Sequence, residues 1–143
     1  MTAVIDWYSR FVLSWRLSNS MDGSFCREAL LEALERYGTP EIFNTDQGAQ
    51  FTSPQFTSIL LSHNVRISMD GRGRALDNVF CERLWRSVKY ECLYLRVLES
   101  VPEVREALIW YFDLHNNRKP HQALKYKTPK TVFENERTGL LLK

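Results

Sequence analysis

Several features that mark common protein classes are scarce in this 143-residue chain. It has only three cysteines, Cys26, Cys81 and Cys92, and they form no C-x-x-C pair. This odd number argues against a disulfide framework and favours a reducing, cytoplasmic setting. No hydrophobic run approaches the length of a membrane span, and the first residues show no basic-then-apolar signal pattern. We therefore expect a protein that works without a membrane.

Net charge and repetition are also scarce. The net charge of +2 is too small to indicate nucleic-acid binding by itself, so the distribution of charge has to decide that question. There are no internal repeats and no low-complexity linker. Hydrophobic residues make up 44% and charged residues 25% of the chain, which is typical of a globular protein. The length suffices for one domain with a sizeable core.

Short apolar runs and helix signals alternate along the chain. Strands are predicted at 2–6, 11–17, 41–45 and 65–68, with a tight turn joining the first two. Helices are predicted over 22–36, from 54, over 78–95 and 100–117, and from 129. Ser53 and Ser100 stand at helix starts as capping residues. This interleaving predicts an α/β fold with a mixed sheet covered by helices.

The stretch FNTDQGAQFTS, residues 43–53, places Asp46 at the end of a predicted strand and Gly48 two residues later. Read alone, it is equally well an ordinary strand-to-helix turn. If Asp46 has a functional role, the turn holds its carboxylate at the edge of the sheet, and Gly48 permits close approach of the backbone.

The predicted helix over 78–95 carries two different stripes. One stripe is apolar and is expected to face the core: Cys81, Trp85, Val88 and Cys92. The other stripe is polar: Asn78, Glu82, Arg86 and Lys89. On the evidence of the helix alone, the favoured explanation of the polar stripe is a solvated face with an ion pair between Glu82 and Arg86.

The Asp46 turn and the polar stripe that contains Glu82 indicate a function more specifically together than either does alone. Asp46 and Glu82 are separated by 35 residues, and Lys89 follows Glu82 by seven. This spacing, with VIDWYSRFVLSW, NTDQGAQFTS, SMDGRGRALDNVFCERLWRSVKYE and KPHQALKYKTP in this order, resembles the acidic-triad transposases and retroviral integrases. These sequence motifs are most similar to those of the integrase-like transposases of bacterial insertion sequences. The resemblance runs from Thr2 to about Phe133.

The resemblance implies a ribonuclease H-like fold and a transposase catalytic core over residues 1–143, with a short tail from about residue 118. It implies DNA end cleavage and strand transfer at a site where Asp46 and Glu82 bind Mg²⁺ or Mn²⁺. DNA ends and target DNA are the expected partners, together with further copies of the chain or full-length transposase. Residues expected to contact DNA are Arg72, Arg74, Arg86 and Lys89, beside Arg83.

The first carboxylate of the family triad has no match in this chain. In the family it lies on a strand before the VIDWYSR motif, so Asp6 is expected to order the hairpin turn with Ser9 and Arg10. We accordingly expect an N-terminally truncated core that is inactive alone and binds the cation weakly. The alternative is a non-catalytic DNA-binding or assembly remnant that pairs with full-length transposase.

A second basic group lies towards the C-terminus: Arg118, Lys119, Lys125, Lys127 and Lys130. It is interpreted either as a further phosphate-binding group or as solubilising surface charge. His63 and His115 are expected to be packing or capping residues.

Overall fold

The computed structural model describes residues 1–20, 22–69 and 79–141. The chain divides into two compact units. The first unit comprises Met1–Val4 and Leu13–Val79, and the second comprises Ile5–Val12 and Phe80–Lys143. The N-terminal hairpin thus contributes its strands mainly to the first unit and its turn to the second. Within the described ranges, no helix is both long and apolar enough to cross a membrane.

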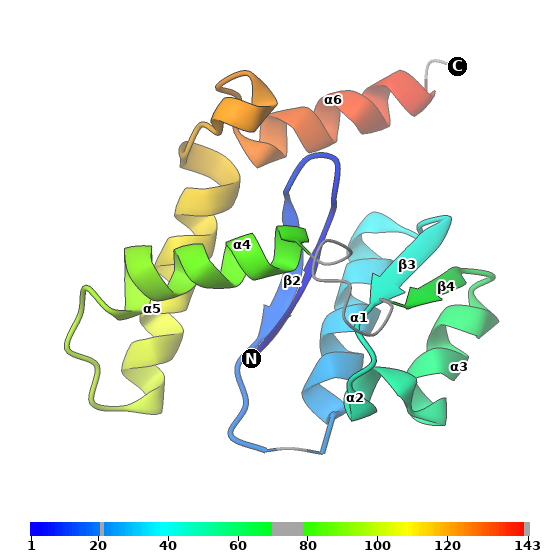
Figure 1. Cartoon of the computed structure of the whole chain (residues 1–143). Coiled ribbons are helices and arrows are strands. Elements are labelled where there is room, and N and C mark those ends of the chain that lie inside the picture. The colour runs from blue at the N-terminus through cyan, green and yellow to red at the C-terminus, as the bar shows by residue number, and fades with distance from the viewer. Residues whose placement is uncertain (21, 70–78, 142–143) are drawn as a thin grey trace. The chain divides into compact units, whose positions relative to one another are not determined.

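The strands pair as two small sheets. β1 (Thr2–Ile5) pairs with β2 (Val12–Arg16), and β3 (Ile42–Thr45) pairs with β4 (Arg66–Met69). β3 and β4 run parallel, with Phe43 opposite Ile67 and Thr45 opposite Met69 (Figure 1). The parallel pair needs a helical connection, and α2 with α3 provides it. Strands and helices alternate through the first unit, so the predicted α/β class is confirmed.

Helices of the first unit follow the predicted positions, with one addition. They are α1 (Ser24–Tyr37), α2 (Ala49–Thr52) and α3 (Pro54–Ser62). Ser53 caps α3 by accepting a hydrogen bond from the Phe56 N–H at 3.4 Å, and Pro54 takes the first helical position. The short helix α2, directly after the Asp46 turn, was not predicted.

The core of the first unit lies where α1 and α3 meet the strand pair. Its buried members are Cys26, Leu30, Leu34, Phe56, Leu60 and Val65. Phe43 of β3 packs against this cluster, and its ring lies 6.1 Å from that of Phe56. Strand β3 is therefore held in place by the apolar face of α3, immediately before Asp46.

The second unit is mainly helical. Its elements are α4 (Val79–Val88), a π-helical turn η2 (Lys89–Leu93), α5 (Val101–Asp113), a second π-helical turn η3 (Leu114–Arg118), a 3₁₀ turn η4 (Gln122–Leu124) and α6 (Pro129–Leu141). Ser100 caps α5 as predicted, accepting from the Glu103 N–H at 3.3 Å. The Glu103 carboxylate accepts from the Glu99 N–H at 2.7 Å, which completes the start of the helix.

The apolar stripe predicted for α4 is corrected in part. Leu84, Val88 and Cys92 are buried, whereas Cys81 and Trp85 are only half-buried. The buried side is turned towards Leu84, and the helix widens into η2 before it reaches Cys92, which changes the 3.6-residue period on which the prediction rests. Cys92 is fixed by a hydrogen bond from its thiol to the Ala107 carbonyl of α5 at 3.4 Å.

Candidate active site

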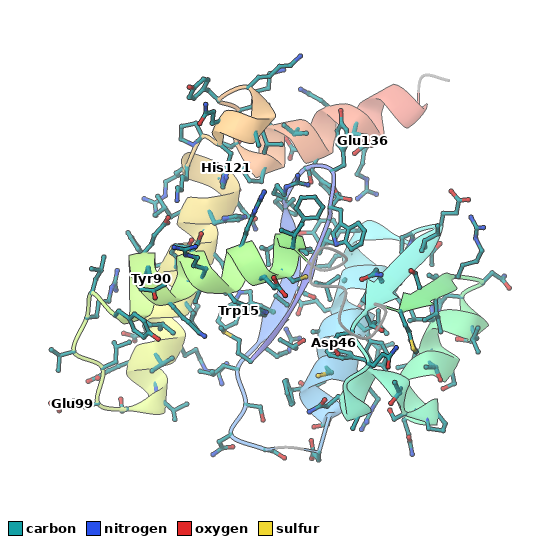
Figure 2. All side chains as sticks on the ribbon, viewed as in Figure 1. Trp15, Asp46, Tyr90, Glu99, His121 and Glu136 are labelled. Atoms are coloured by element: carbon teal, nitrogen blue, oxygen red, sulfur yellow. The ribbon has the colours of Figure 1, made fainter. Side chains whose placement is uncertain are left out.

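Asp46 is the first residue beyond β3. Thr45 before it is buried, whereas Asp46 is exposed. The Asp46 Oδ1 atom accepts a hydrogen bond from the Gly48 N–H at 2.7 Å, so the turn itself fixes the carboxylate (Figure 2). Among the described residues, the other carboxylate oxygen has no hydrogen-bond partner. A fixed, solvent-facing carboxylate at a strand end is what the sequence predicts here.

Gly48 is required for space rather than for an unusual backbone conformation. Its φ of −59° and ψ of 147° suit any residue. A Cβ atom at this position would lie 2.8 Å from Asp46 Oδ1 and 3.2 Å from the Gln50 Oε1 atom. The Asp46 carboxylate thus lies so close to the Gly48 backbone that no side chain fits there without a shift.

We expect Gly48→Ala to displace the Asp46 carboxylate and to lower the free energy of unfolding of the first unit by about 1–3 kcal/mol, as overpacking does. The added methyl group cannot coexist with the present position of Asp46 Oδ1. Urea denaturation followed by circular dichroism measures the change.

A double-mutant cycle isolates the cause of this effect. In an Asp46→Ala background the closest contact is gone and only the flexible end of Gln50 has to move, so Gly48→Ala should cost far less than in the unaltered chain. Ala49→Ser, at the neighbouring exposed position, is the control and should be neutral. Equal costs of Gly48→Ala in both backgrounds would show that the Asp46 contact is not responsible.

Glu82 lies in the first turn of α4 and is exposed. Within the described part of the chain, its carboxylate forms no hydrogen bond and no ion pair, so the alternative of a Glu82–Arg86 ion pair is wrong. Arg86 instead places its guanidinium 5.9 Å from the centroid of the Tyr90 ring. The Glu82 carboxylate is thus open to a ligand.

Asp46 and Glu82 present the hard oxygen donors that Mg²⁺ and Mn²⁺ prefer. Asp46 belongs to the first unit and Glu82 to the second, so their approach to each other stays a prediction. Considering only residues 1–20, 22–69 and 79–141, no cluster of three or more His, Cys, Asp or Glu side chains is arranged to hold a metal ion. Burial raises the pKa of the Cys26 thiol, which keeps it protonated and unsuited to binding such a cation.

The exposed side of α4 and the adjoining turn carry the predicted basic residues. Arg86 and Lys89 are exposed, as is Arg83. The predicted DNA contacts Arg72 and Arg74 lie outside the described residues. Arg10 was not predicted as part of this group: its guanidinium lies 3.6 Å from the centroid of the Phe80 ring at the start of α4. Burial, and next the charge of Arg83, lower the pKa of Arg10.

Asp6 orders the hairpin turn, as predicted. Its Oδ2 atom accepts hydrogen bonds from the Ser9 N–H at 2.8 Å and from the Ser9 hydroxyl at 2.5 Å. The backbone closes the turn with hydrogen bonds from Asp6 N–H to the Phe11 carbonyl and from Arg10 N–H to the Asp6 carbonyl. Arg10 adopts a φ of 64°, a strained value for a non-glycine residue. The Asp6 carboxylate is therefore engaged in the turn.

Two residues of η3, the π-helical turn that follows α5, bind the hairpin turn. The Asn116 side chain donates to the Val12 carbonyl and accepts from the Val12 N–H, both at 2.9 Å, like a neighbouring strand. His115 donates from Nε2 to the Arg10 carbonyl at 2.9 Å. Burial lowers the pKa of His115 to about 4, so the ring is neutral at physiological pH. The expected packing role of His115 is confirmed, whereas no local sequence signal indicated the Asn116 contact.

Carboxylates pair with most of the second basic group. Ion pairs join Arg118 to Asp113 at 3.1 Å and Lys119 to Glu91 at 2.5 Å. Lys130 lies 3.9 Å from Glu134. These three cations are already compensated within the second unit, which favours a structural and solubilising role for them.

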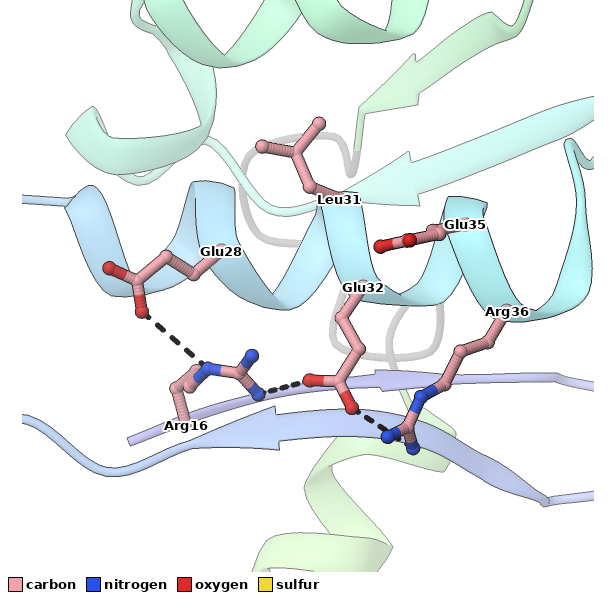
Figure 3. A pocket seen from close by; sticks show the side chains of 6 residues that line it. All are labelled: Arg16, Glu28, Leu31, Glu32, Glu35 and Arg36. Carbon is pink, nitrogen blue, oxygen red and sulfur yellow. Dashed lines mark ion pairs between the residues drawn. The ribbon is translucent and has the colours of Figure 1, made fainter.

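A shallow pocket of about 680 Å³ lies in the first unit between Arg16 and α1. Its lining residues are Arg16, Glu28, Leu31, Glu32, Glu35 and Arg36 (Figure 3). Glu32 binds the guanidinium groups of both Arg16 and Arg36, and Arg16 lies 3.5 Å from Glu28. These ion pairs occupy the charged groups of the pocket, and Asp46 does not line it.

Comparison with protein families gives two matches that together cover most of the chain. A family model described as "Integrase core domain" matches residues 1–75, and a second with the same description matches residues 63–129. The candidate residue Asp46 lies in the first matched region and Glu82 in the second.

Curated relatives are transposases of bacterial insertion sequences. The transposase for insertion sequence element IS904 of Lactococcus lactis is 30% identical over 129 residues, covering 88% of this chain and 51% of that protein. Transposase InsF for insertion sequence IS3A of Escherichia coli is 33% identical over 120 residues, covering 82% of this chain and 42% of that protein. The chain thus spans about half the length of these relatives.

Similar solved structures are retroviral integrases. The catalytic core domain of BIV integrase is 18% identical, with a TM-score of 0.74, and the match covers 96% of this chain and 88% of that one. The HTLV-2 integrase catalytic core domain in complex with magnesium, in its dimeric form, is 20% identical with a TM-score of 0.62, covering 87% and 77%. These likenesses confirm the predicted ribonuclease H-like fold.

Proposed function

The chain belongs to the integrase core domain family, within its insertion-sequence transposases, and from this membership we propose that residues 1–143 form a catalytic core for DNA transposition and DNA integration. The reaction is phosphoryl transfer: a water or a 3′-hydroxyl attacks a DNA phosphate, and the bond to the leaving oxygen breaks on the opposite side. Residues from about 118 onward form a tail to this core.

The proposal rests on the exposure and the hydrogen bonding of the Asp46 and Glu82 carboxylates. Asp46 is exposed and fixed by Gly48 at a strand end, and Glu82 is exposed with no protein partner among the described residues. Both would hold Mg²⁺ or Mn²⁺, and a bound cation supplies an activated nucleophile and stabilises charge on the leaving oxygen. The structure of the HTLV-2 integrase catalytic core domain in complex with magnesium supports this choice of cation.

Arg86 and Lys89 are the residues that we propose to contact DNA phosphates. Both are exposed on the helix that carries Glu82, and neither forms an ion pair with another described residue. Arg72 and Arg74, from the stretch before α4, are proposed to add to this basic surface. We further propose that the chain acts with other copies of itself or with a longer transposase, in a cytoplasmic, DNA-bound setting.

The DNA contact has a direct test. Joint replacement of Arg86 and Lys89 by alanine should weaken duplex DNA binding and flatten its salt dependence. Each lost phosphate contact lowers the slope of log K against log salt by about 0.9, so the pair should lower it by about 1.8. Fluorescence anisotropy at several salt concentrations measures both quantities.

Arg36→Ala with Arg105→Ala is the matched control, because it removes the same charge from exposed positions outside the proposed DNA surface. This control should leave the slope nearly unchanged. An unchanged slope in the Arg86 and Lys89 variant, or an equal loss in the control, would show that this helix face does not meet phosphate specifically.

A further inference from the structure

The helix that carries Glu82 continues into an exposed pair of aromatic rings. Glu82, Arg86, Tyr90 and Tyr94 follow one another at every fourth residue. Tyr90 is 60% exposed and Tyr94 65% exposed. Their ring centroids lie 5.3 Å apart with an interplanar angle of 87°, so one ring meets the other edge to face. Such an arrangement leaves ring surface open to solvent (Tyr90 is labelled in Figure 2).

The backbone holds this pair in place. Residues Lys89–Leu93 form the π-helical turn η2, which is closed by a hydrogen bond from the Tyr94 N–H to the Lys89 carbonyl at 2.8 Å. π-helical turns are rare and often occur at functional positions. The exposure of the two rings also indicates a function. Two large aromatic rings that lie side by side in solvent do not contribute to the core of the second unit.

The charges around the rings favour a negatively charged ligand. The Arg86 guanidinium lies over the Tyr90 ring, 5.9 Å from its centroid, and Lys89 is exposed beside it. The only carboxylate within η2, that of Glu91, is bound by the Lys119 ammonium at 2.5 Å and by the Tyr111 hydroxyl at 3.3 Å. Its charge is therefore compensated, and the surface next to the rings is basic.

We propose that Tyr90 and Tyr94 form a stacking platform for unpaired bases of a DNA end, with Arg86 and Lys89 neutralising the adjoining phosphates. Aromatic faces flanked by cations bind single-stranded DNA in this way without strong sequence preference. The platform rests on the proposed DNA function and adds to it a preference for unpaired bases. Tyr94 lies twelve residues after Glu82, a length that spans about 18 Å in an α-helix and somewhat less across the π-helical turn, on the order of five stacked nucleotides.

The test compares two DNA probes with the full 143-residue chain. One is a blunt duplex, and the other carries a short 3′ overhang with 2-aminopurine, whose fluorescence falls when the base stacks. The unaltered chain should bind the overhang more tightly and quench its fluorescence. Tyr90→Ala with Tyr94→Ala should lower overhang affinity by at least about fivefold and abolish the quenching, whereas Tyr90→Phe with Tyr94→Phe should retain both.

Blunt-duplex binding separates the platform from the function on which it rests. The alanine pair should leave duplex affinity and its salt slope unchanged, because tyrosine neutralises no phosphate. Salt-dependent duplex binding without any preference for the overhang would overturn the platform alone. Absence of duplex binding altogether would overturn the proposed function and the platform with it.

Leu95→Ala with Val97→Ala provides a control for general apolar docking, since these neighbours are 75% and 88% exposed but have no ring faces. The control should bind the overhang as the unaltered chain does. If the control loses as much overhang affinity as the tyrosine-to-alanine variant, the platform is wrong. The platform is also wrong if ultracentrifugation shows that the tyrosine pair holds two protein chains together, because the surface is then a protein interface.

Discussion

Metal-dependent joining of a labelled DNA end to plasmid DNA is expected to be absent from the 143-residue chain, and to appear when a strand bearing a third carboxylate is fused ahead of Met1. The reason is charge. Two divalent cations carry four positive charges, and Asp46 with Glu82 supplies only two negative ones. The DNA phosphate contributes further charge, but a third protein carboxylate would be needed to hold two such cations.

In the fused protein, Asp46→Asn or Glu82→Gln should each abolish joining. Either change removes a ligand charge while keeping the shape of the side chain. Loss of several kcal/mol of charge stabilisation corresponds to a rate reduced on the order of a thousandfold. Asp6→Asn should matter little, because an amide oxygen can still accept the hydrogen bonds from Ser9.

Three outcomes would contradict this expectation in different ways. Robust joining by the unfused chain that is lost on Asp6→Asn would make Asp6 the third carboxylate. Joining that survives Asp46→Asn would remove Asp46 from the site. No joining by the fused protein, with DNA binding intact, would favour the alternative of a non-catalytic DNA-binding or assembly module.

Phe56→Ala should lower the free energy of unfolding of the first unit by about 3–5 kcal/mol. Phe56 is 1% exposed and lies at the centre of the core cluster, with the Phe51 ring 5.3 Å away and the Phe43 ring 6.1 Å away. Its removal leaves a cavity behind β3, so the strand that ends at Asp46 should also lose protection from hydrogen exchange.

Leu61→Ala is the matched control for this change. Leu61 lies in the same helix but is 62% exposed, so its truncation should cost less than about 0.5 kcal/mol. Urea denaturation gives the free energies, and hydrogen exchange followed by mass spectrometry reports on β3 and β4. A small effect of Phe56→Ala, similar to that of the control, would show that α3 does not hold β3 in place.

Local signals explain what could be predicted from the sequence. Ser53 followed by Pro54, and Ser100 followed by Glu103, start helices through contacts within four residues, and the structure confirms both. The Asp46 turn was recognised for the same reason, because its aspartate and glycine are two residues apart. Helix α2 was missed because four residues are too few to show a helical period.

Contacts between distant parts of the chain explain what could not be predicted. The period of an isolated helix does not reveal that α4 turns Leu84 inward or that it widens at η2. Nothing near Asn116 indicates that its side chain binds Val12, and nothing near Arg10 indicates that its guanidinium covers Phe80. The candidate site residues were predicted from local pattern and resemblance, whereas the contacts that support them depend on tertiary packing.

The hold of Asn116 and His115 on the hairpin turn has a consequence for how the protein is made. The partners of the turn lie 104 and 105 residues later in the chain, so they leave the ribosome well after the turn itself. At about 5–20 residues per second, the turn waits roughly 5–20 s before those partners are synthesised. During that interval the Val12 N–H and carbonyl lack the Asn116 side chain, and the turn relies on its own backbone hydrogen bonds and on those that Ser9 donates to Asp6. The short-range hydrogen bonds of Asp6 thus hold the nascent hairpin in shape until the C-terminal half of the chain arrives to secure it.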